Sequence, residues 1–457
     1  MKRYFGTDGV RGTVNQAPMT AEFALTLGRA AGHVLTRHLR HKPQVLIGKD
    51  TRLSGYMIES ALCAGLTAQG MNVLLVGPVP TPAVAYLTRS LRADAGVMLS
   101  ASHNPACDNG IKFFANDGFK LPDEIELEIE HCIDNLPQLP PAMDIGKASR
   151  VDDARGRYIE FLKSALPRGM RFDGMKVVVD CANGAAYDVA PRILRELGCE
   201  VIAMAATPDG YNINKDCGST HPESMTERVV ESGADIGLAL DGDADRLIAC
   251  DANGQIVDGD RVIAILAGYA VTQGVLTGGA VVTTLMSNMG LERYLSGIGL
   301  EMRRAAVGDR YVLEMMCDTG CNIGGEQSGH MILLDYNTTG DGLMSGLQLM
   351  LAMSGQGKAL ADLAADMSLF PQKLWNIVMQ ERKNVMADDG VRLLIEEAEE
   401  RLNGSGRINV RMSGTEPKLR IMVEAEDELL MLDVGESLAQ AITARVCSTQ
   451  VRDGLNA

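Results

Sequence analysis

The sequence predicts an α/β protein in which three successive α/β domains, with mixed but mostly parallel sheets, precede a smaller C-terminal α+β domain. Short apolar runs alternate with longer segments of helical period along most of the chain. The chain has 457 residues, which is enough for about three or four domains of ~100 to 200 residues each. The alternation stops after about residue 368, where we expect the last domain to begin.

The first block contains a βαβ unit. Residues 44–48 predict a strand, and Ser54 is placed to cap a helix whose apolar side chains recur every fourth position from Ile58 to Leu66 and which stops at Gly70. Residues 72–76 predict the next strand. Such a unit implies a parallel sheet, in which ligands collect in the loops at the carboxyl ends of the strands.

The alternation recurs in two further blocks, which begin near residues 175 and 278. A proline-rich segment over residues 135–147 predicts a linker after the first block. In the last part, an acidic helix over 391–402 lies among short strands, which favours an antiparallel sheet. We therefore expect domains at residues 1–150, 151–252, 253–367 and 368–457.

Charge and composition exclude several classes of partner. The formal net charge of -16 opposes binding to nucleic acid or to an anionic membrane surface, and no dense basic patch offsets it. The ten cysteines are irregularly spaced, as expected of reduced thiols in a cytosol. No apolar segment has the length of a signal peptide or of a membrane span. We expect a cytoplasmic protein with a small-molecule substrate and neither nucleic acid nor membrane as partner.

The segment LALDGDADRLIAC, residues 238–250, is the sharpest local signal. It places Asp241, Asp243 and Asp245 after an apolar strand, and three crowded carboxylates favour a hard cation such as Mg²⁺ or Ca²⁺. An EF-hand fails because Arg246 and Ala252 stand where glycine and glutamate are needed. A haloacid-dehalogenase phosphatase with Asp241 as nucleophile is weakened by Asp245, and a solvated acidic turn is the simplest alternative.

The segment SASHNP, residues 100–105, presents Ser102 at the end of an apolar run without a Gly-x-Ser-x-Gly elbow. A serine next to a metal loop suits the carriage of a phosphoryl group, with a phosphoserine oxygen completing the metal shell. His103 and Lys112 lie in the longer stretch 100–112, and either could orient or protonate the reacting group. The alternative is that Ser100 and Ser102 only hydrogen-bond the turn.

Two later segments have residues suited to sugar phosphates. Guanidinium groups, hydroxyls and a glycine turn between residues 409 and 423 suit a phosphate dianion, although a surface ion-pair cluster has the same composition. The glycine-rich segment 324–334 carries Glu326, Ser328 and His330, which suit a hydroxyl-rich ligand. The phosphate-binding candidates are Arg411, Ser413, Gly414, Thr415 and Arg420.

Five motifs together resemble the α-D-phosphohexomutase superfamily over essentially the whole chain. In the family's order they are FGTDGVRG at 5–12, SASHNP at 100–105, DGDADR at 241–246, GEQSGH at 325–330 and RMSGTEPKLR at 411–420. Gln327, Ala244 and the segment 307–312 are similar to the members that act on glucosamine phosphates.

The resemblance implies four domains around a central cleft and a phosphoserine at Ser102. Mg²⁺ would be held by a phosphoserine oxygen with Asp241, Asp243 and Asp245. The enzyme, an isomerase, would interconvert glucosamine 6-phosphate and glucosamine 1-phosphate through a sugar 1,6-bisphosphate, which is both intermediate and activator. The product would feed synthesis of UDP-N-acetylglucosamine, a peptidoglycan precursor, and the chain could form a homodimer.

The resemblance also implies a role for each remaining candidate. Positive and polar groups would surround the transferred phosphoryl group, Lys112 or His330 would transfer the proton, and Glu326 and Ser328 would hold sugar hydroxyls. The groups at the phosphoryl are Arg11, His103, Lys112 and Arg246. Arg411, Ser413, Gly414, Thr415 and Arg420 would grip the phosphate that is not reacting.

Three alternatives stay open on the sequence alone. A phosphomannomutase or phosphoglucomutase would use the same machinery on another sugar. A Mg²⁺-dependent sugar phosphatase would use Asp241 and release inorganic phosphate. A noncatalytic sugar-phosphate sensor ranks last, because Ser102 and all three aspartates are present.

Overall fold

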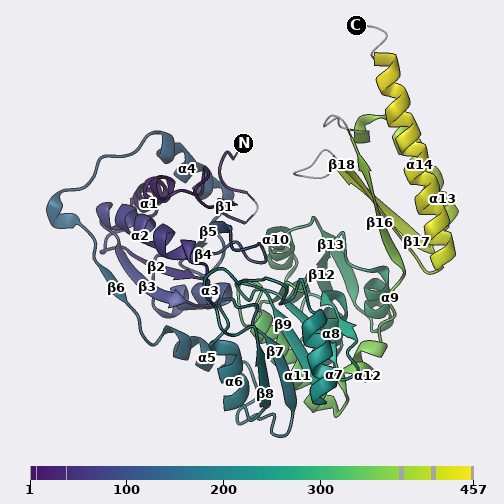
Figure 1. Ribbon diagram of the computed structural model, residues 1–457, viewed down its shortest axis with the longest axis horizontal. Coiled ribbons are helices and arrows are strands. Elements are labelled where there is room, and N and C mark those ends of the chain that lie inside the picture. The colour runs from purple at the N-terminus through teal and green to yellow at the C-terminus, as the bar shows by residue number, and fades with distance from the viewer. Residues whose placement is uncertain (1, 7, 38, 380–384, 413–417, 454–457) are drawn as a thin grey trace. The chain divides into compact units, whose positions relative to one another are not determined.

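The computed structural model describes residues 2–6, 8–37, 39–379, 385–412 and 418–453. They form two compact units, one of residues 1–284 and 300–366 and one of residues 285–299 and 367–457. The first unit contains three sheets with helices, and the second contains one smaller sheet (Figure 1). The predicted fold class, three α/β blocks followed by a smaller α+β one, is confirmed.

The first sheet has the strand order β1-β5-β4-β2-β3-β6. Its strands are β1 (Val10–Thr13), β2 (Gln44–Lys49), β3 (Asn72–Pro78), β4 (Ala95–Leu99), β5 (Asp108–Ala115) and β6 (Ala148–Arg150). Strands β4, β2, β3 and β6 run parallel, β5 is antiparallel to β4, and β1 is antiparallel to β5. The predicted βαβ unit is therefore present, and the segment 135–147 before β6 is largely exposed and contains the short helix η1 (Ala142–Asp144).

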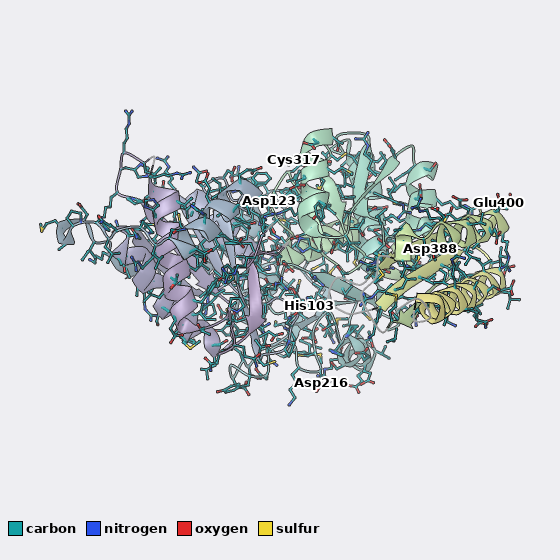
Figure 2. The ribbon with its side chains drawn as sticks, turned by 90° about the horizontal axis from the view of Figure 1, so that it is seen from above. His103, Asp123, Asp216, Cys317, Asp388 and Glu400 are labelled. Atoms are coloured by element: carbon teal, nitrogen blue, oxygen red, sulfur yellow. The ribbon has the colours of Figure 1, made fainter. Side chains whose placement is uncertain are left out.

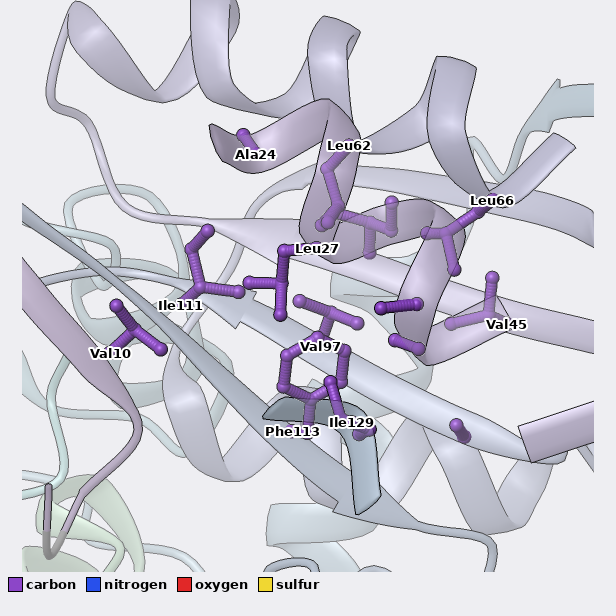
Figure 3. Close-up of a cluster of buried hydrophobic side chains, with 14 of the residues drawn as sticks. Val10, Ala24, Leu27, Val45, Leu62, Leu66, Val97, Ile111, Phe113 and Ile129 are labelled. Carbon is purple, nitrogen blue, oxygen red and sulfur yellow. The ribbon is translucent and has the colours of Figure 1, made fainter. Parts of the chain in front are cut away.

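Helices cover both faces of this sheet. Helices α1 (Ala21–Thr36), α2 (Ser54–Ala68) and α4 (Asp123–Asp134) lie on one face and α3 (Thr81–Ser90) on the other (Figure 1). Leu27 of α1 and Leu62 of α2 interleave with Val97 and Phe113 of the strands, all of them buried (Figure 3). Burial of apolar area at ~25 cal/mol per Å² makes such a core the main source of stability.

Ser54 does not cap α2 as the sequence suggested. It is the first residue of the helix, and no side chain caps that end. The Ser54 hydroxyl instead accepts a hydrogen bond from Asn109 Nδ2 at 2.9 Å. Serine is a favoured residue at helix N-caps, so the local sequence predicts a cap here. In the structure the hydroxyl bonds instead to a residue that is distant in the sequence.

The second sheet has the order β11-β10-β9-β7-β8. It comprises β7 (Lys176–Asp180), β8 (Glu200–Met204), β9 (Ile236–Leu240), β10 (Leu247–Asp251) and β11 (Ile256–Val257), with helices α5 (Ala154–Ser164), α6 (Val189–Glu196) and α7 (Glu223–Ser232). Strands β8, β7 and β9 are parallel, β10 is antiparallel to β9, and β11 is antiparallel to β10.

The third sheet has the order β13-β12-β14-β15. Its strands are β12 (Ala280–Thr284), β13 (Glu301–Ala305), β14 (Ile323–Gly325) and β15 (Met331–Leu333), and its helices are α8 (Gly259–Gln273), α10 (Asp309–Thr319), α11 (Gly342–Gln356) and α12 (Leu360–Ala365). Here β13, β12 and β14 are parallel and β15 is antiparallel to β14.

The three sheets share one feature that positions the site. In each, a parallel strand is followed directly by an antiparallel partner, at β4–β5, β9–β10 and β14–β15. The three connecting loops carry Ser102, the aspartates 241–245 and the segment 326–330, respectively. The residues that the sequence singled out therefore occupy equivalent topological positions at the carboxyl ends of parallel strands, where α/β proteins bind ligands.

The second unit has an antiparallel sheet of order β16-β18-β17, as the sequence predicted. Its elements are α9 (Met289–Gly297), β16 (Gln372–Val378), η2 (Val385–Ala387), α13 (Asp389–Leu402), β17 (Gly406–Met412), β18 (Lys418–Ala425) and α14 (Glu428–Asp453). Met289 N of the inserted segment donates to Glu424 Oε1 at 2.7 Å, which ties it to β18. Among the described residues no helix has the length and apolar character to span a bilayer.

Candidate active site

Ser102 lies in the β4–β5 loop with its backbone in the left-handed region, at φ 53°. Its side chain is 1% exposed, and its Oγ donates a hydrogen bond of 2.6 Å to Asp241 Oδ2. His103 Nδ1 lies 3.4 Å from the same Oγ. The fold therefore brings the serine loop and the aspartate loop, which are 139 residues apart, into direct contact.

Asp241, Asp243 and Asp245 converge at the end of β9. All three are buried, and one carboxylate oxygen of each lies within 4.8 Å of the others. Asp243 Oδ2 accepts from Thr81 Oγ1 at 2.6 Å and from Lys112 Nζ at 2.8 Å. Within the described residues, Asp243 Oδ1 is buried and receives no hydrogen bond. The cluster is thus held by other blocks of the first unit but keeps unused acceptor capacity.

The donor set fits a hard divalent cation. It offers carboxylate oxygens only, and Mg²⁺ and Ca²⁺ prefer such ligands. Burial and the charges of Asp245 and Asp243 hold the pKa of Asp241 well above its ordinary value, because the three charges repel one another. A bound cation would relieve that repulsion and would use the free oxygen of Asp243. The predicted metal-ligating aspartates are therefore compatible with metal binding.

Positive groups surround the cluster. Burial opposes the charge on Lys112, but Asp243, Asp8 and Asp245 outweigh it and raise the pKa of the ammonium above its ordinary value. Burial likewise opposes the charged form of His330, while Asp245 raises the pKa of its imidazole to about 9. Both side chains are therefore held protonated at neutral pH beside the carboxylates.

His103 is in a different electrostatic position. Burial, followed by the positive charges of Arg246 and Arg11, lowers the pKa of His103 to about 4. Its imidazole is therefore neutral at pH 7, with Nδ1 facing the Ser102 hydroxyl. A neutral ring in this position can accept or donate a hydrogen bond but adds no charge at the serine.

The β14–β15 loop joins the same cluster. Arg246 and His330 form an antiparallel bridge, and Leu247 N donates to Gly329 O at 2.9 Å, so this loop is tied to the aspartate loop. Glu326 accepts from Ser328 Oγ and, through its other oxygen, from the Gly308 backbone N–H, both at 3.1 Å. Both oxygens of Glu326 therefore accept hydrogen bonds from neighbouring residues, and Ser328 is exposed.

A cavity of about 460 Å³ opens over this arrangement. Of the sequence-predicted residues, its wall contains Arg11, Ser102, Asp245, Arg246, Glu326 and His330. Lys112, Asp241 and Asp243 lie beneath it, bonded to one another or to Ser102. The first unit therefore assembles most of the predicted catalytic, metal-ligating and sugar-binding residues around one cavity of a size suited to a small ligand.

Three charged residues of the site were not selected from the sequence. Asp8 pairs with Arg11 and lies 3.0 Å from Lys112 Nζ, and Lys120 Nζ bridges Asp8 and Asp309 at 2.5 Å each. Asp8 lies inside the motif FGTDGVRG at 5–12, and Asp309 lies inside the segment 307–312, VGDRYV. Both residues could therefore have been selected from these motifs. Lys120 belongs to neither motif and carried none.

The phosphate-binding candidates belong to the second unit. Arg411 of β17 and Arg420 of β18 are register partners, directly opposite each other. Like charges opposite each other in a sheet are unfavourable by themselves. Ser413, Gly414 and Thr415 fall outside the described residues.

Four sequence models of one family match the chain in succession. All are described as phosphoglucomutase/phosphomannomutase: α/β/α domain I over residues 2–139, domain II over 156–254, domain III over 258–370 and the C-terminal domain over 374–441. Together the matches extend over most of the chain.

Curated relatives and solved structures agree with this match. A phosphoglucosamine mutase of Paracoccus denitrificans is 56% identical over 443 residues, 96% of this chain and 99% of that protein. One of Ruegeria pomeroyi is 54% identical, covering 98% of this chain and 100% of that protein. A phosphoglucomutase/phosphomannomutase family protein from Burkholderia thailandensis has a TM-score of 0.80 at 24% identity, covering 97% and 98% of the two chains.

A more distant structure carries ligands. An Aspergillus fumigatus N-acetylphosphoglucosamine mutase, solved with GlcNAc-6P and magnesium, has a TM-score of 0.65 at 18% identity and covers 97% of this chain and 96% of that chain. At such identities the two solved structures establish a common fold.

Proposed function

The chain belongs to the phosphoglucomutase/phosphomannomutase family, and within it to the phosphoglucosamine mutases, and on that premise we propose that it isomerises glucosamine 6-phosphate and glucosamine 1-phosphate through a phosphorylated Ser102. The resemblance drawn from the five motifs is thereby confirmed. The chain is an enzyme of the isomerase class, a phosphosugar mutase.

One contact carries the proposal for Ser102. Its Oγ is 2.6 Å from Asp241 Oδ2, inside the carboxylate cluster and in the wall of the cavity. A phosphoryl group on that oxygen would place an acceptor oxygen next to the same carboxylates. Asp241, Asp243 and Asp245 together with the phosphoserine would hold Mg²⁺, which when bound withdraws charge from the group being transferred.

The first transfer breaks the bond between phosphorus and Ser102 Oγ and forms one to the C1 hydroxyl oxygen of glucosamine 6-phosphate. The proton of that hydroxyl ends, in net terms, on Ser102 Oγ. We assign its transfer to Lys112 or His330: either group, held protonated beside the cluster, would donate its proton to the leaving Oγ and regain one from the C1 hydroxyl. Arg11, Arg246 and His103 surround the phosphoryl group, where fixed positive charge and hydrogen bonds favour the transition state.

The second transfer returns the other phosphoryl group to Ser102. The 1,6-bisphosphate turns around, the bond between phosphorus and its C6 oxygen breaks, and glucosamine 1-phosphate leaves. Glu326 and Ser328 hold sugar hydroxyls, and a sugar 1,6-bisphosphate serves as activator by loading Ser102. In the second unit, Arg411, Ser413, Gly414, Thr415 and Arg420 bind a phosphate group; binding energy from such a remote group can orient the reacting end.

Further properties follow from this proposal. The product would supply UDP-N-acetylglucosamine synthesis for peptidoglycan, in the cytoplasm. A homodimer is the expected assembly. The four domains at residues 1–150, 151–252, 253–367 and 368–457 stay our proposal for how the chain divides.

The substrate is tested by ³¹P NMR. The phosphorylated protein with Mg²⁺ and a trace of sugar 1,6-bisphosphate is given glucosamine 6-phosphate, glucose 6-phosphate or mannose 6-phosphate in separate samples. We expect the glucosamine compound to convert to its 1-phosphate fastest, by at least about 10-fold. Faster conversion of glucose or mannose phosphate would indicate the phosphoglucomutase or phosphomannomutase alternative. Inorganic phosphate as the sole product would indicate a phosphatase.

A further inference from the structure

The carbonyl oxygen of Ser102 is held from two sides. It accepts a hydrogen bond from Arg52 Nη2 at 2.9 Å and another from Asn214 Nδ2 at 2.9 Å. The same two side chains also donate to the carbonyl oxygen of Asn104, at 2.8 Å and 3.0 Å. Two donors from distant parts of the chain thus converge on the backbone of the serine loop and not on its functional side chains.

Most hydrogen bonds of the Arg52 side chain go to this loop. It is 0% exposed and lies between β2 and α2, next to the loop after the neighbouring strand β4. Its Nη1 donates to the carbonyl oxygens of Pro105 and Asp108, and its Nε donates to Asp50 Oδ2 at 2.8 Å. A buried guanidinium that binds four carbonyls of one loop fixes the path of that loop, because each donor sits in a rigid planar fork.

Asp50 joins this network to the N–H side of Ser102. Its Oδ2 accepts from Ser100 Oγ at 2.6 Å, and Ser100 Oγ accepts from Ser102 N at 2.9 Å. Both polar groups of the Ser102 backbone are therefore held, the N–H through Ser100 and the carbonyl through Arg52 and Asn214.

Asn214, in the β8–α7 loop, holds the Ser102 carbonyl oxygen from the second side. Its backbone is left-handed, at φ 57°, and its N–H donates to Ala182 O at 2.9 Å, so the side chain projects from a fixed support. Gly242 closes a third side: a Cβ there would lie 2.6 Å from Ser102 O and 2.8 Å from Asn214 Nδ2. The aspartate loop can approach the serine this closely only with glycine at position 242.

We propose that Arg52 and Asn214 are positioning residues for phosphoryl transfer, which hold the Ser102 backbone in its left-handed conformation so that Oγ faces the aspartate cluster. Left-handed backbone is unfavourable for a non-glycine residue, so Ser102 keeps φ 53° only where its surroundings impose it. Neither Arg52 nor Asn214 lines the cavity. The inference rests on the proposed function, because it requires Ser102 to carry the phosphoryl group.

The test uses Asn214→Gly with Asp216→Gly as its matched control. Both residues have a left-handed backbone in the same loop, which glycine tolerates. Asp216 is exposed and lies at the edge of the molecule, away from His103 (Figure 2). Only the Asn214 change removes the two hydrogen bonds that Nδ2 donates to the serine loop. Arg52→Lys, which keeps the buried charge beside Asp50 but loses the fork, provides a second variant.

Activity is measured as kcat and KM for glucosamine 6-phosphate, per mole of phosphoserine determined by intact mass. We expect Asn214→Gly and Arg52→Lys each to lower kcat by about 10- to 100-fold, with KM within about threefold, because small misplacements of a reacting group have effects of this size. Asp216→Gly should match the unaltered protein.

Two results separate this inference from the proposed function. If Asn214→Gly lowers the Tm but keeps the kcat of the Asp216→Gly control, its role is structural and the positioning inference is wrong. If instead Ser102→Ala, assayed alongside, retains substantial turnover, the proposed function itself fails and the positioning inference fails with it.

Discussion

The serine loop and the aspartate loop stabilise buried charge in opposite ways. In the hydrogen-bond network behind the Ser102 backbone, the Asp50 carboxylate is matched by Arg52 and Ser100, with both oxygens bonded. Around Asp241, three carboxylates crowd together, and within the described part of the chain Asp243 Oδ1 receives no hydrogen bond. The first loop is held by hydrogen bonds within the chain, whereas the second keeps an acceptor oxygen that a bound cation would use.

This difference indicates which part of the site the chain builds rigidly and which part a ligand completes. In the proposed mechanism the serine keeps one orientation through both transfers, and the hydrogen bonds of its backbone with Arg52, Asn214 and Ser100 fix that orientation without contacting Oγ. The aspartates are crowded together, and burial with the charges of Asp245 and Asp243 raises the pKa of Asp241. A bound cation would relieve this repulsion.

The largest effect should come from removing the group that the serine loop positions. Ser102→Ala deletes the Oγ and leaves the backbone contacts of Arg52 and Asn214 in place. We expect mutase kcat to fall by about 10⁴-fold or more, the size seen when a covalent catalytic group is removed, with little change in Tm. Substantial remaining turnover, measured by the ³¹P assay, would contradict the phosphoserine mechanism.

The next largest effect is on the thermal stability of the metal-free protein, which should differ between substitutions in the serine network and in the aspartate loop. Without metal, Asp50→Asn leaves the buried Arg52 guanidinium without its counter-charge, so we expect Tm to fall by roughly 5 to 10 °C. Asp241→Asn removes one of three repelling charges, so the Tm of the metal-free protein should stay equal or rise. Scanning calorimetry in EDTA and then in excess Mg²⁺ measures both.

The same experiment includes its control and a pH dependence. Mg²⁺ should raise the Tm of the unaltered protein and of Asp50→Asn but not of Asp241→Asn. Because the folded pKa of Asp241 is raised, its protonation stabilises the metal-free protein at low pH, and that contribution is lost as pH rises. Asp241→Asn should therefore reduce the fall in Tm with rising pH. If Asp50→Asn and Asp241→Asn changed the Tm equally, the proposed difference in how the two loops stabilise buried charge would be wrong.

The sequence predicted the parts of the site that lie in local patterns. Strand 44–48, the antiparallel C-terminal sheet and the aspartates 241–245 all depend on neighbours in the chain, and the structure contains each of them. Short-range periodicity and turn composition carry this information. The family match confirmed the class and the activity.

The parts that escaped prediction depend on contacts between distant segments. Arg52 and Asn214 bond to main-chain oxygens 50 and 112 residues away, which leaves no mark on side-chain pattern. Ser54 has the composition of a cap but bonds Asn109, 55 residues away. Lys120 sits outside every motif and acts between Asp8 and Asp309.

The most direct measurement of the central claim is a single turnover of phosphorylated protein with glucosamine 6-phosphate, with the phosphoryl group located by peptide mass spectrometry before and after mixing. We predict that the group is on Ser102 at the start and appears as glucosamine 1,6-bisphosphate within the time of one turnover. Phosphoryl found on Asp241, or released as inorganic phosphate without any bisphosphate, would contradict the account.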